Sequence, residues 1–201
     1  MNSHISDKKI GLFGLSANPP HYGHVKMAQY AKSVLGLDEV WWIVAAHNPL
    51  KDAAELAPFE DRVKMCEIIA DDYKWLKVSD VEQRLGLNKS FDVIKAVVAE
   101  NPENQFTWII GGDNLVNFHK WYKWQDILNI LPVAVMARPG QMEAAARSPA
   151  YGYARTLPEN PFTLLDNPLV PISSTALRQN LNAEYTKPKV IDHIRQKRLY
   201  P

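Results

Sequence analysis

The sequence predicts an α/β fold, a Rossmann-like open parallel sheet with helices on both faces. Short runs of β-branched and aromatic residues alternate with segments whose apolar residues recur at helical spacing, and this alternation is typical of β-α-β units. The run 39–45 (EVWWIVA) is apolar on both faces, as expected of a central parallel strand covered by helices on each side. The 201 residues, of which 46% are hydrophobic, suffice for one core, so we expect a single domain over 1–201.

The individual elements follow from local composition in chain order. The first strand precedes a loop rich in Asn and Pro, and the helix after that loop has one apolar face and ends at Gly36. The helix after the second strand is expected to bury Cys66 in the core. The stretch 140–161 is rich in Ala, Arg and Pro with weak periodicity, which predicts an irregular excursion or a mobile helix and loop. The expected strands are 9–15, 39–45, 76–81, 106–110, 133–137 and 162–165, and the expected helices are 23–35, 59–70, 91–100, 173–181 and 190–199.

Charge and cysteine content argue against several kinds of partner. With 23 Lys and Arg against 22 Asp and Glu, the net charge of +1 creates no overall field that would recruit nucleic acid or an anionic membrane. One cysteine permits no internal disulfide, and the polar start (MNSHISDKK) lacks an apolar secretory segment. The apolar run 131–137 is far shorter than the ~20 residues that span a bilayer. We therefore expect a cytoplasmic protein. The sequence is compatible with a homo-oligomer and does not define the oligomeric state.

The loop after the first strand carries the strongest chemical signal, Asn18-Pro19-Pro20-His21-Tyr22-Gly23-His24. In an open parallel sheet, ligands bind outside the carboxyl ends of the strands, where this loop is expected to lie. Two imidazoles at the start of a helix, together with its free amide groups, can hold a phosphate on which negative charge develops. A bare H-x-x-H is more often a pair of ordinary loop and cap residues. The position of His21 and His24 and the flanking prolines favour phosphate binding.

A second signal lies near the other end of the chain, in Ile172-Ser173-Ser174-Thr175-Ala176-Leu177-Arg178. Capping a helix needs only one hydroxyl, so three hydroxyls exceed that requirement. Arg178 returns to the helical face of Ser174, where a guanidinium can bind phosphate oxygens together with the amides of the helix start. Taken alone, the segment favours phosphate binding only slightly over a helix cap.

Together, the two segments resemble the nucleotidylyltransferase superfamily, whose motifs H-x-G-H and I-S-S-T-x-x-R both occur intact. The resemblance also suggests a distant kinship with the class I aminoacyl-tRNA synthetases. Further stretches resemble the bacterial nicotinate-nucleotide adenylyltransferases over nearly the whole chain. They are 14–24, 48–51, 62–65, 108–121 (WIIGGDNLVNFHKW), 138–140, 172–178 and 190–200.

This resemblance implies an activity and a set of site residues. The chain would transfer AMP from ATP to nicotinate mononucleotide, giving deamido-NAD and pyrophosphate, and helices over about 173–201 would complete the ATP site. Magnesium would arrive with ATP, since the sequence shows no cluster of carboxylate ligands of its own. The resemblance assigns catalysis to His21, His24 and Arg178; ATP binding to Gly14, Ser16, His21, His24, Lys51, Gly111, Asp113, Arg138, Ser173, Ser174, Thr175 and Arg178; and mononucleotide binding to Asn18, Asp92, Trp121 and Tyr122.

Two departures from the family pattern bear on these expectations. Leu15 and Ala17 stand where the family usually has a second glycine and a phenylalanine in the first loop. Asp92 stands where a small hydroxyl residue is common, near the expected pyridine pocket. An aspartate there would repel a nicotinate carboxylate, unless its side chain caps the following helix. Because residues 90–92 immediately precede an apolar helical run, we expect the cap.

Three alternative functions remain open from the sequence. A pantetheine-phosphate adenylyltransferase would share the first motif, but typically is shorter and lacks the Trp-Tyr and Arg-Pro-Gly landmarks. A nicotinamide-preferring enzyme of the same fold would differ only in a few pocket groups. A catalytically inactive nucleotide-binding module would explain the altered glycine turn, although both motifs are intact.

Overall fold

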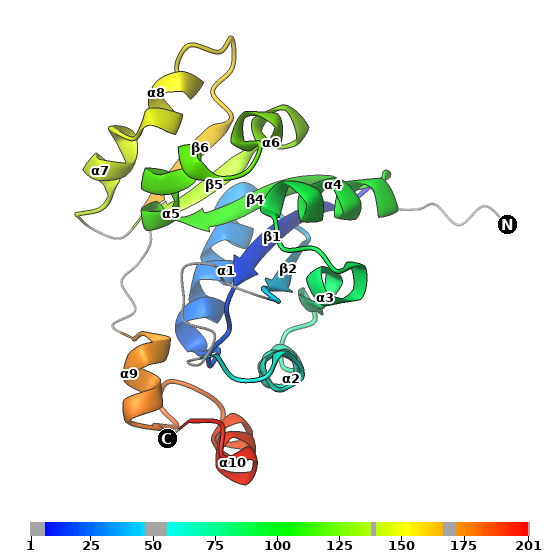
Figure 1. Cartoon of the computed structure of the whole chain (residues 1–201), viewed down its shortest axis with the longest axis vertical. Helices are drawn as coiled ribbons and strands as arrows, with labels where there is room; N and C mark the ends of the chain where they lie inside the picture. Colours follow the sequence, from blue (N-terminus) through cyan, green and yellow to red (C-terminus); the bar gives the residue numbers. More distant parts are fainter. Residues whose placement is uncertain (1–6, 47–55, 138–139, 167–171, 201) are drawn as a thin grey trace, which may run out of the picture.

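The computed structural model describes residues 7–46, 56–137, 140–166 and 172–200. Within these residues, six strands form one sheet in the order β3-β2-β1-β4-β5-β6, and every neighbouring pair is parallel (Figure 1). The strands are β1 (Lys9–Leu15), β2 (Glu39–Val44), β3 (Leu76–Ser79), β4 (Gln105–Gly111), β5 (Val133–Ala137) and β6 (Phe162–Asp166). The predicted α/β fold with an open parallel sheet is confirmed.

Helices cover both faces of this sheet, and each face has its own buried cluster. Apolar side chains of α1, α2 and α10 pack on one face, and those of α4, α5, α6 and α8 pack on the other. Cys66 is fully buried in the first of these clusters, as predicted. The helices are α1 (Tyr22–Leu35), α2 (Phe59–Ala70), α3 (Val81–Leu85), α4 (Ser90–Glu100), α5 (Gly112–Asn117), the 3-10 helix η2 (Phe118–Lys120), α6 (Trp124–Ile130), α7 (Met142–Ala146), α8 (Pro149–Ala154), α9 (Ser174–Gln179) and α10 (Pro188–Lys197).

Three parts of the sequence prediction need correction. The third strand ends at Ser79 rather than at 81, because Asp80 is followed by the short helix α3, in which Val81 is buried. The helices α5, η2 and α6 between β4 and β5 were not predicted, since each is too short to show a helical period. The stretch 140–161 contains α7 and α8, and Ser148 caps α8 by accepting a hydrogen bond from the backbone N–H of Tyr151.

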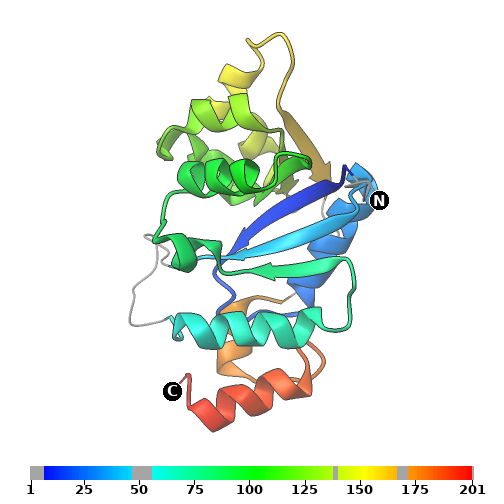
Figure 2. The same ribbon diagram turned by 90° about the vertical axis from the view of Figure 1, so that its right-hand side faces the viewer.

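The strand order defines where a ligand would bind. The chain moves outward from β1 through β2 to β3, and then returns to the other side of β1 with β4. In an open parallel sheet, ligands bind beyond the carboxyl ends of the strands where the order reverses, and this point lies between β1 and β4. The helices α9 and α10 lie beyond this end of β1, and α10 runs alongside α2 (Figure 2). Residues 172–200 thus pack against the turn after β1 and against α2.

Candidate functional site

The two histidines of the first motif meet at the start of α1. His21 is the N-cap residue and is 6% exposed, while His24 is the third residue of the helix. The backbone N–H of His21 donates to Nδ1 of His24 at 3.1 Å, and the backbone N–H of His24 donates to the carbonyl of His21 at 2.9 Å. Their ring centroids are 3.8 Å apart. The structure therefore joins the two imidazoles into one compact unit at the helix start.

This arrangement decides which nitrogen of His24 can donate a hydrogen bond. Because Nδ1 accepts from the His21 backbone, the proton of a neutral ring must sit on Nε2. The ring also packs edge-on against the buried side chain of Trp42, with centroids 6.3 Å apart. Backbone and packing contacts thus hold the imidazole with Nε2 as its donor, as a phosphate-binding group requires.

The turn that leads to His21 is held by three donors from two other parts of the chain, the helices α2 and α9. The carbonyl of Ser16 accepts from Nη1 of Arg62 at 2.8 Å, and that of Asn18 accepts from Nη1 of Arg178 at 2.8 Å. The carbonyl of Pro19 accepts from the hydroxyl of Ser174 at 2.9 Å. Each donor offsets the partial negative charge of a carbonyl oxygen. The turn therefore presents less negative charge to an approaching phosphate.

The second motif forms the start of α9 and contacts the first motif directly. Ser173 is the N-cap and accepts from the backbone N–H of Ala176 at 3.1 Å. Ser174 and Arg178 contact the turn after β1 from the same face of the helix, and Nη2 of Arg178 lies 3.4 Å from the hydroxyl of Thr175. Two segments more than 150 residues apart in sequence are thus brought together, as the sequence predicts. The hydroxyls of Ser173 and Ser174 both make hydrogen bonds within the protein. These hydrogen bonds could not be predicted from the sequence.

Asn18 lies inside the turn rather than at its surface. It is 1% exposed, and its Oδ1 accepts from the backbone N–H of Ala57 and from the hydroxyl of Tyr200, both at 2.9 Å. The guanidinium of Arg178 lies over the Tyr200 ring, 5.9 Å from its centroid. These contacts make Asn18 a support of the turn, and its contact with the mononucleotide stays a prediction. Tyr200 was not predicted as a site residue, although it ends the stretch 190–200 that resembles the family.

The end of β4 supplies the next group of predicted ATP-binding residues. Gly111 is the N-cap of α5, and Asp113 is exposed in the first turn of that helix. A Cβ on Gly111 would lie 2.5 Å from Oδ1 of Asp113, so the close approach of this carboxylate requires glycine. At the end of β1, a Cβ on Gly14 would lie 3.2 Å from the ring of Trp108. Lys51 and Arg138, also predicted to bind ATP, lie outside the described residues.

The residues predicted to bind the mononucleotide lie around α4 and η2. Tyr122 is 49% exposed and packs edge-on against Phe91, with centroids 6.1 Å apart. Trp121 stacks at 4.9 Å on the ring of the buried Phe118. The contact between Phe91 and Tyr122 brings the first turn of α4, which contains Asp92, next to this aromatic pair. The structure thus brings the first turn of α4 beside Tyr122, and mononucleotide binding by Asp92, Trp121 and Tyr122 stays a prediction.

The expectation that Asp92 caps α4 is wrong. The helix begins at Ser90 with Lys89 as its N-cap residue, and Asp92 is the third residue inside the helix. The apolar periodicity that starts at Phe91 was taken as the start of the helix, whereas the helical backbone extends one residue further. An acid in the first turn is still favoured by the free amides and dipole of the helix start. Its negative charge is therefore partly offset in this position.

A partly buried carboxyl group near the end of β2 was not predicted from the sequence. Glu82, at the start of α3, accepts from the backbone N–H of Ala46 at 2.8 Å. Burial raises the pKa of Glu82 to about 7, against the opposing effects of this N–H and of the Arg62 guanidinium. Its position was not predictable because α3 is only five residues long.

We expect Glu82 to make the free energy of unfolding depend on pH. Between its ordinary pKa of 4.5 and the folded value of about 7, the folded protein keeps a proton that the unfolded chain releases. Stability therefore falls as pH rises through this window, by about 3 kcal/mol at ~1.4 kcal/mol per pH unit. Urea unfolding at pH 5 and pH 8 should show this fall in the wild type and lose it in Glu82→Gln. Glu143→Gln, which removes an exposed carboxylate, serves as the control, and an equal fall in Glu82→Gln would contradict the assignment.

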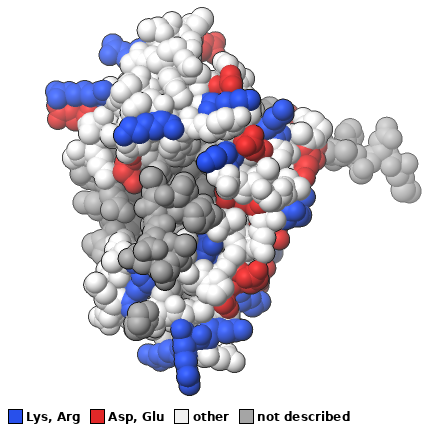
Figure 3. Space-filling view, in the orientation of Figure 1, with Lys and Arg blue, Asp and Glu red and all other residues white. Residues whose placement is uncertain are grey.

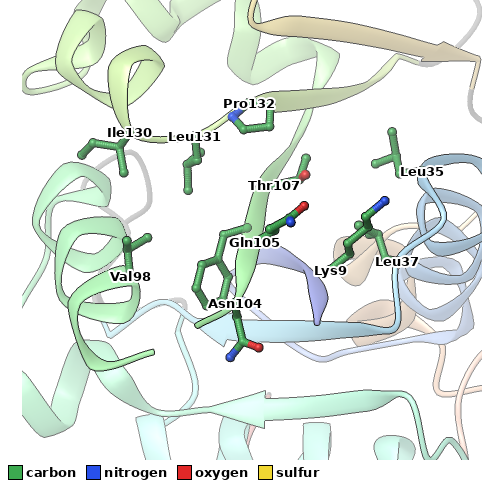
Figure 4. Close-up of a pocket in the computed structure, with 11 residues that line it drawn as sticks. Lys9, Leu35, Leu37, Val98, Asn104, Gln105, Thr107, Ile130, Leu131 and Pro132 are labelled. Carbon is green, nitrogen blue, oxygen red and sulfur yellow. The ribbon is translucent and has the colours of Figure 1, made fainter. Parts of the chain in front are cut away.

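A separate hollow of about 490 Å³ lies at the amino ends of the strands, opposite the two motifs. Residues at the starts of β1, β4 and β5 line it, among them Lys9, Gln105 and Pro132 (Figure 4). No histidine or arginine is among the residues that line it. On the visible face of the molecule, Lys and Arg side chains gather at the end formed by α10 (Figure 3). The candidate site therefore lies at the carboxyl ends of β1 and β4.

The described residues contain no group of three or more His, Cys, Asp and Glu side chains that could hold a metal ion. None of the helices in the described part of the chain is long and apolar enough to cross a membrane.

Comparisons with known proteins agree with the fold and with both motifs. Residues 12–180 match the family model described as cytidylyltransferase-like. Proteins from Agrobacterium fabrum and Rhizobium meliloti, both named probable nicotinate-nucleotide adenylyltransferases, are 40% and 41% identical to this chain. The alignments cover 85% and 84% of this chain and 98% and 96% of those proteins. The structure of the nicotinic acid mononucleotide adenylyltransferase of Plasmodium falciparum complexed with NaAD has the same fold, with a TM-score of 0.75, 20% identity and coverage of 96% and 97%.

Proposed function

The chain belongs to the nicotinate-nucleotide adenylyltransferases of the cytidylyltransferase-like family, and on this premise we propose that it transfers AMP from ATP to nicotinate mononucleotide. The products are deamido-NAD and pyrophosphate. The observation that carries the proposal beyond family membership is the direct contact between the two motifs. Arg178 and Ser174 of the second motif bind the very turn that presents His21 and His24.

The proposed reaction is an in-line attack by the 5′-phosphate of the mononucleotide on the α-phosphorus of ATP. The bond to the β-phosphate breaks, and pyrophosphate leaves with the electron pair. The attacking phosphate is already an anion, so the reaction needs no general base. The protein has to align the reactants and stabilise the charge that gathers on the α-phosphate and the leaving group.

The residues of the site divide these tasks in the proposed mechanism. His24 donates from Nε2 to a phosphate oxygen, with His21 beside it at the positive end of α1. Arg178 binds the pyrophosphate part of ATP through the guanidinium nitrogens that the turn leaves available. The helices after residue 172 thus complete the ATP site. Asp113 accepts a hydrogen bond from a ribose hydroxyl, and Trp121 offers a flat surface to the pyridine ring.

Magnesium enters this scheme with the nucleotide. The ion prefers phosphate oxygens and water, so ATP can supply most of its ligands. When bound, it neutralises charge on the leaving pyrophosphate. The exposed Asp113 is the nearest described carboxylate to the ends of β1 and β4 that could add a ligand.

A pyrophosphate-release assay tests the proposed function directly. ATP is supplied with nicotinate mononucleotide, nicotinamide mononucleotide or pantetheine phosphate in separate reactions. We expect turnover with nicotinate mononucleotide at a kcat/KM at least ~10-fold above that with nicotinamide mononucleotide, equivalent to ~1.4 kcal/mol of discrimination. Pantetheine phosphate should not react. Absence of turnover with every acceptor would leave only nucleotide binding.

A substitution of Asp92 tests which residue determines the choice between the two mononucleotides. The free amides of the first turn of α4 offset part of its charge. We therefore expect Asp92→Thr to change the ratio of the two kcat/KM values by no more than ~3-fold, less than 1 kcal/mol. The opposite result is a wild type that prefers nicotinamide mononucleotide and an Asp92→Thr variant whose preference shifts toward nicotinate mononucleotide. In that case Asp92 determines specificity, and the proposed acceptor is wrong.

A further inference from the structure

Arg62 is a buried cation whose role the proposed mechanism does not use. It lies in the first turn of α2, is 2% exposed, and ranks among the largest fully buried side chains. Its guanidinium donates to four backbone carbonyls rather than to a carboxylate. Nε binds the carbonyl of Ala57 at 2.9 Å, Nη1 binds those of Ser16 and Ala45 at 2.8 and 2.6 Å, and Nη2 binds that of Ala46 at 3.2 Å. The side chain is therefore fixed by hydrogen bonds on every nitrogen.

These four carbonyls belong to three separate segments of the site. Ser16 begins the turn after β1, Ala45 and Ala46 follow the end of β2, and Ala57 precedes α2. The backbone N–H of Ala57 in turn donates to Oδ1 of Asn18, so Ala57 is tied to the same turn a second time. One guanidinium thus joins the segments that follow β1 and β2 and fastens them to the turn that carries His21.

The chemistry of this position requires arginine in particular. A guanidinium is planar and carries five N–H donors at fixed angles, so it can bind carbonyls in several directions at once. A lysine ammonium has three donors on a single atom and cannot reach carbonyls spread around a plane. The cost of burying this charge is offset by the four hydrogen bonds and in part by the nearby carboxyls of Glu82 and Glu60, so the geometry of these backbone segments is what the residue provides.

We propose that Arg62 is a positioning residue for adenylyl transfer. It holds the turn after β1 so that His21 and His24 meet the phosphates in a fixed geometry, without itself touching a substrate. This role rests on the proposed function. Misplacing catalytic groups by about 1 Å can cost ~100-fold in rate, so a looser turn reduces kcat while ATP still binds through Arg178 and the helix amides.

The test compares Arg62→Lys with the wild type, and Arg84→Lys is the matched control. Arg84 is a half-exposed arginine on α3 that pairs with Glu100 and lies outside the site. We expect Arg62→Lys to lower kcat per folded molecule by about 10- to 100-fold with the KM for ATP changed by less than ~3-fold. Arg84→Lys should leave both values unchanged. A lower melting temperature in Arg62→Lys with unchanged kcat per folded molecule would overturn the proposal, because the residue would then be only structural.

Two further measurements separate this proposal from the proposed function. Nitrogen-15 spectra of the imidazoles report the environment of His21 and His24 without any turnover. We expect their signals to shift in Arg62→Lys and to stay in place in Arg84→Lys, and unchanged signals in Arg62→Lys would overturn the proposal even if the wild type were inactive. If Arg62→Lys folds poorly, Arg62→Ala is assayed with millimolar free guanidinium, and an equal concentration of ammonium is the control. We expect guanidinium to restore more kcat than ammonium does. Equal kcat with the two additives would overturn the proposal.

Discussion

His24→Ala is expected to lower kcat by about 100-fold or more while the protein remains folded. Removing one preorganised donor to a transition-state oxyanion commonly costs ~100- to 1000-fold in rate. The structure identifies this donor as Nε2, because Nδ1 of His24 already accepts from the backbone of His21. Steady-state assays with ATP and nicotinate mononucleotide measure the effect, and circular dichroism confirms folding. The loss of the cap contact alone would cost only ~1 kcal/mol of stability.

A second substitution at this position separates the donor from the ring. The amide of glutamine can place an N–H near the position of Nε2, so His24→Gln should retain more activity than His24→Ala. The glutamine cannot also accept from the His21 backbone as Nδ1 does, and recovery should therefore be partial. Wild-type turnover in a folded His24→Ala protein would remove this residue from the mechanism.

The sequence predicts the fold well where apolar periodicity is long enough to read. The strands 9–15 and 133–137 and the helix 59–70 match the structure residue for residue, because each is bounded by polar or turn residues. The short helices between β4 and β5 escape prediction, since three to seven residues cannot show a helical period. Strand order is likewise absent from the sequence pattern. It emerges only from which strands pair across the sheet.

The candidate site is predictable only in the parts that carry a motif. The sequence places His21, His24, Ser174 and Arg178 together, and the structure brings the two segments into contact. The residues that support them are not visible in a motif, because their partners are backbone atoms of distant segments. Arg62 is an ordinary residue in a helical pattern until its four carbonyl partners are known.

Asp92 shows how a small error in an element boundary changes a functional argument. A cap at Asp92 requires the helix to begin at residue 93, whereas α4 begins three residues earlier, at Ser90, so the predicted cap is a residue of the first turn. The sequence could not resolve this, because Ser90 and Asp92 are both acceptable near a helix start. The contact between Phe91 and Tyr122 brings this first turn beside the predicted pyridine site, and the effect of the Asp92 charge on acceptor choice stays a prediction.

Arg178→Ala is expected to lower kcat/KM for ATP by about 100-fold, the effect of losing charge-assisted hydrogen bonds worth ~1.5–3 kcal/mol each. The KM for ATP should rise more than that for the mononucleotide, since the proposed contact is with the pyrophosphate part. The structure adds a second consequence. Nη1 of Arg178 also binds the carbonyl of Asn18, so the variant loosens the turn that presents His21, and kcat should fall as well.

Two variants distinguish the charge of Arg178 from its contact with the turn. Arg178→Lys keeps the charge but replaces the forked guanidinium with a single ammonium, so it should recover only part of kcat/KM for ATP. Ser174→Ala removes a neutral hydrogen bond to the same turn, at Pro19, and leaves the guanidinium in place. Its loss should be small, about 10-fold at most for a neutral bond worth ~1 kcal/mol. If Arg178→Ala behaves like Ser174→Ala, the guanidinium supports the turn without binding phosphate, and the second motif contributes to the site only as a helix cap and brace.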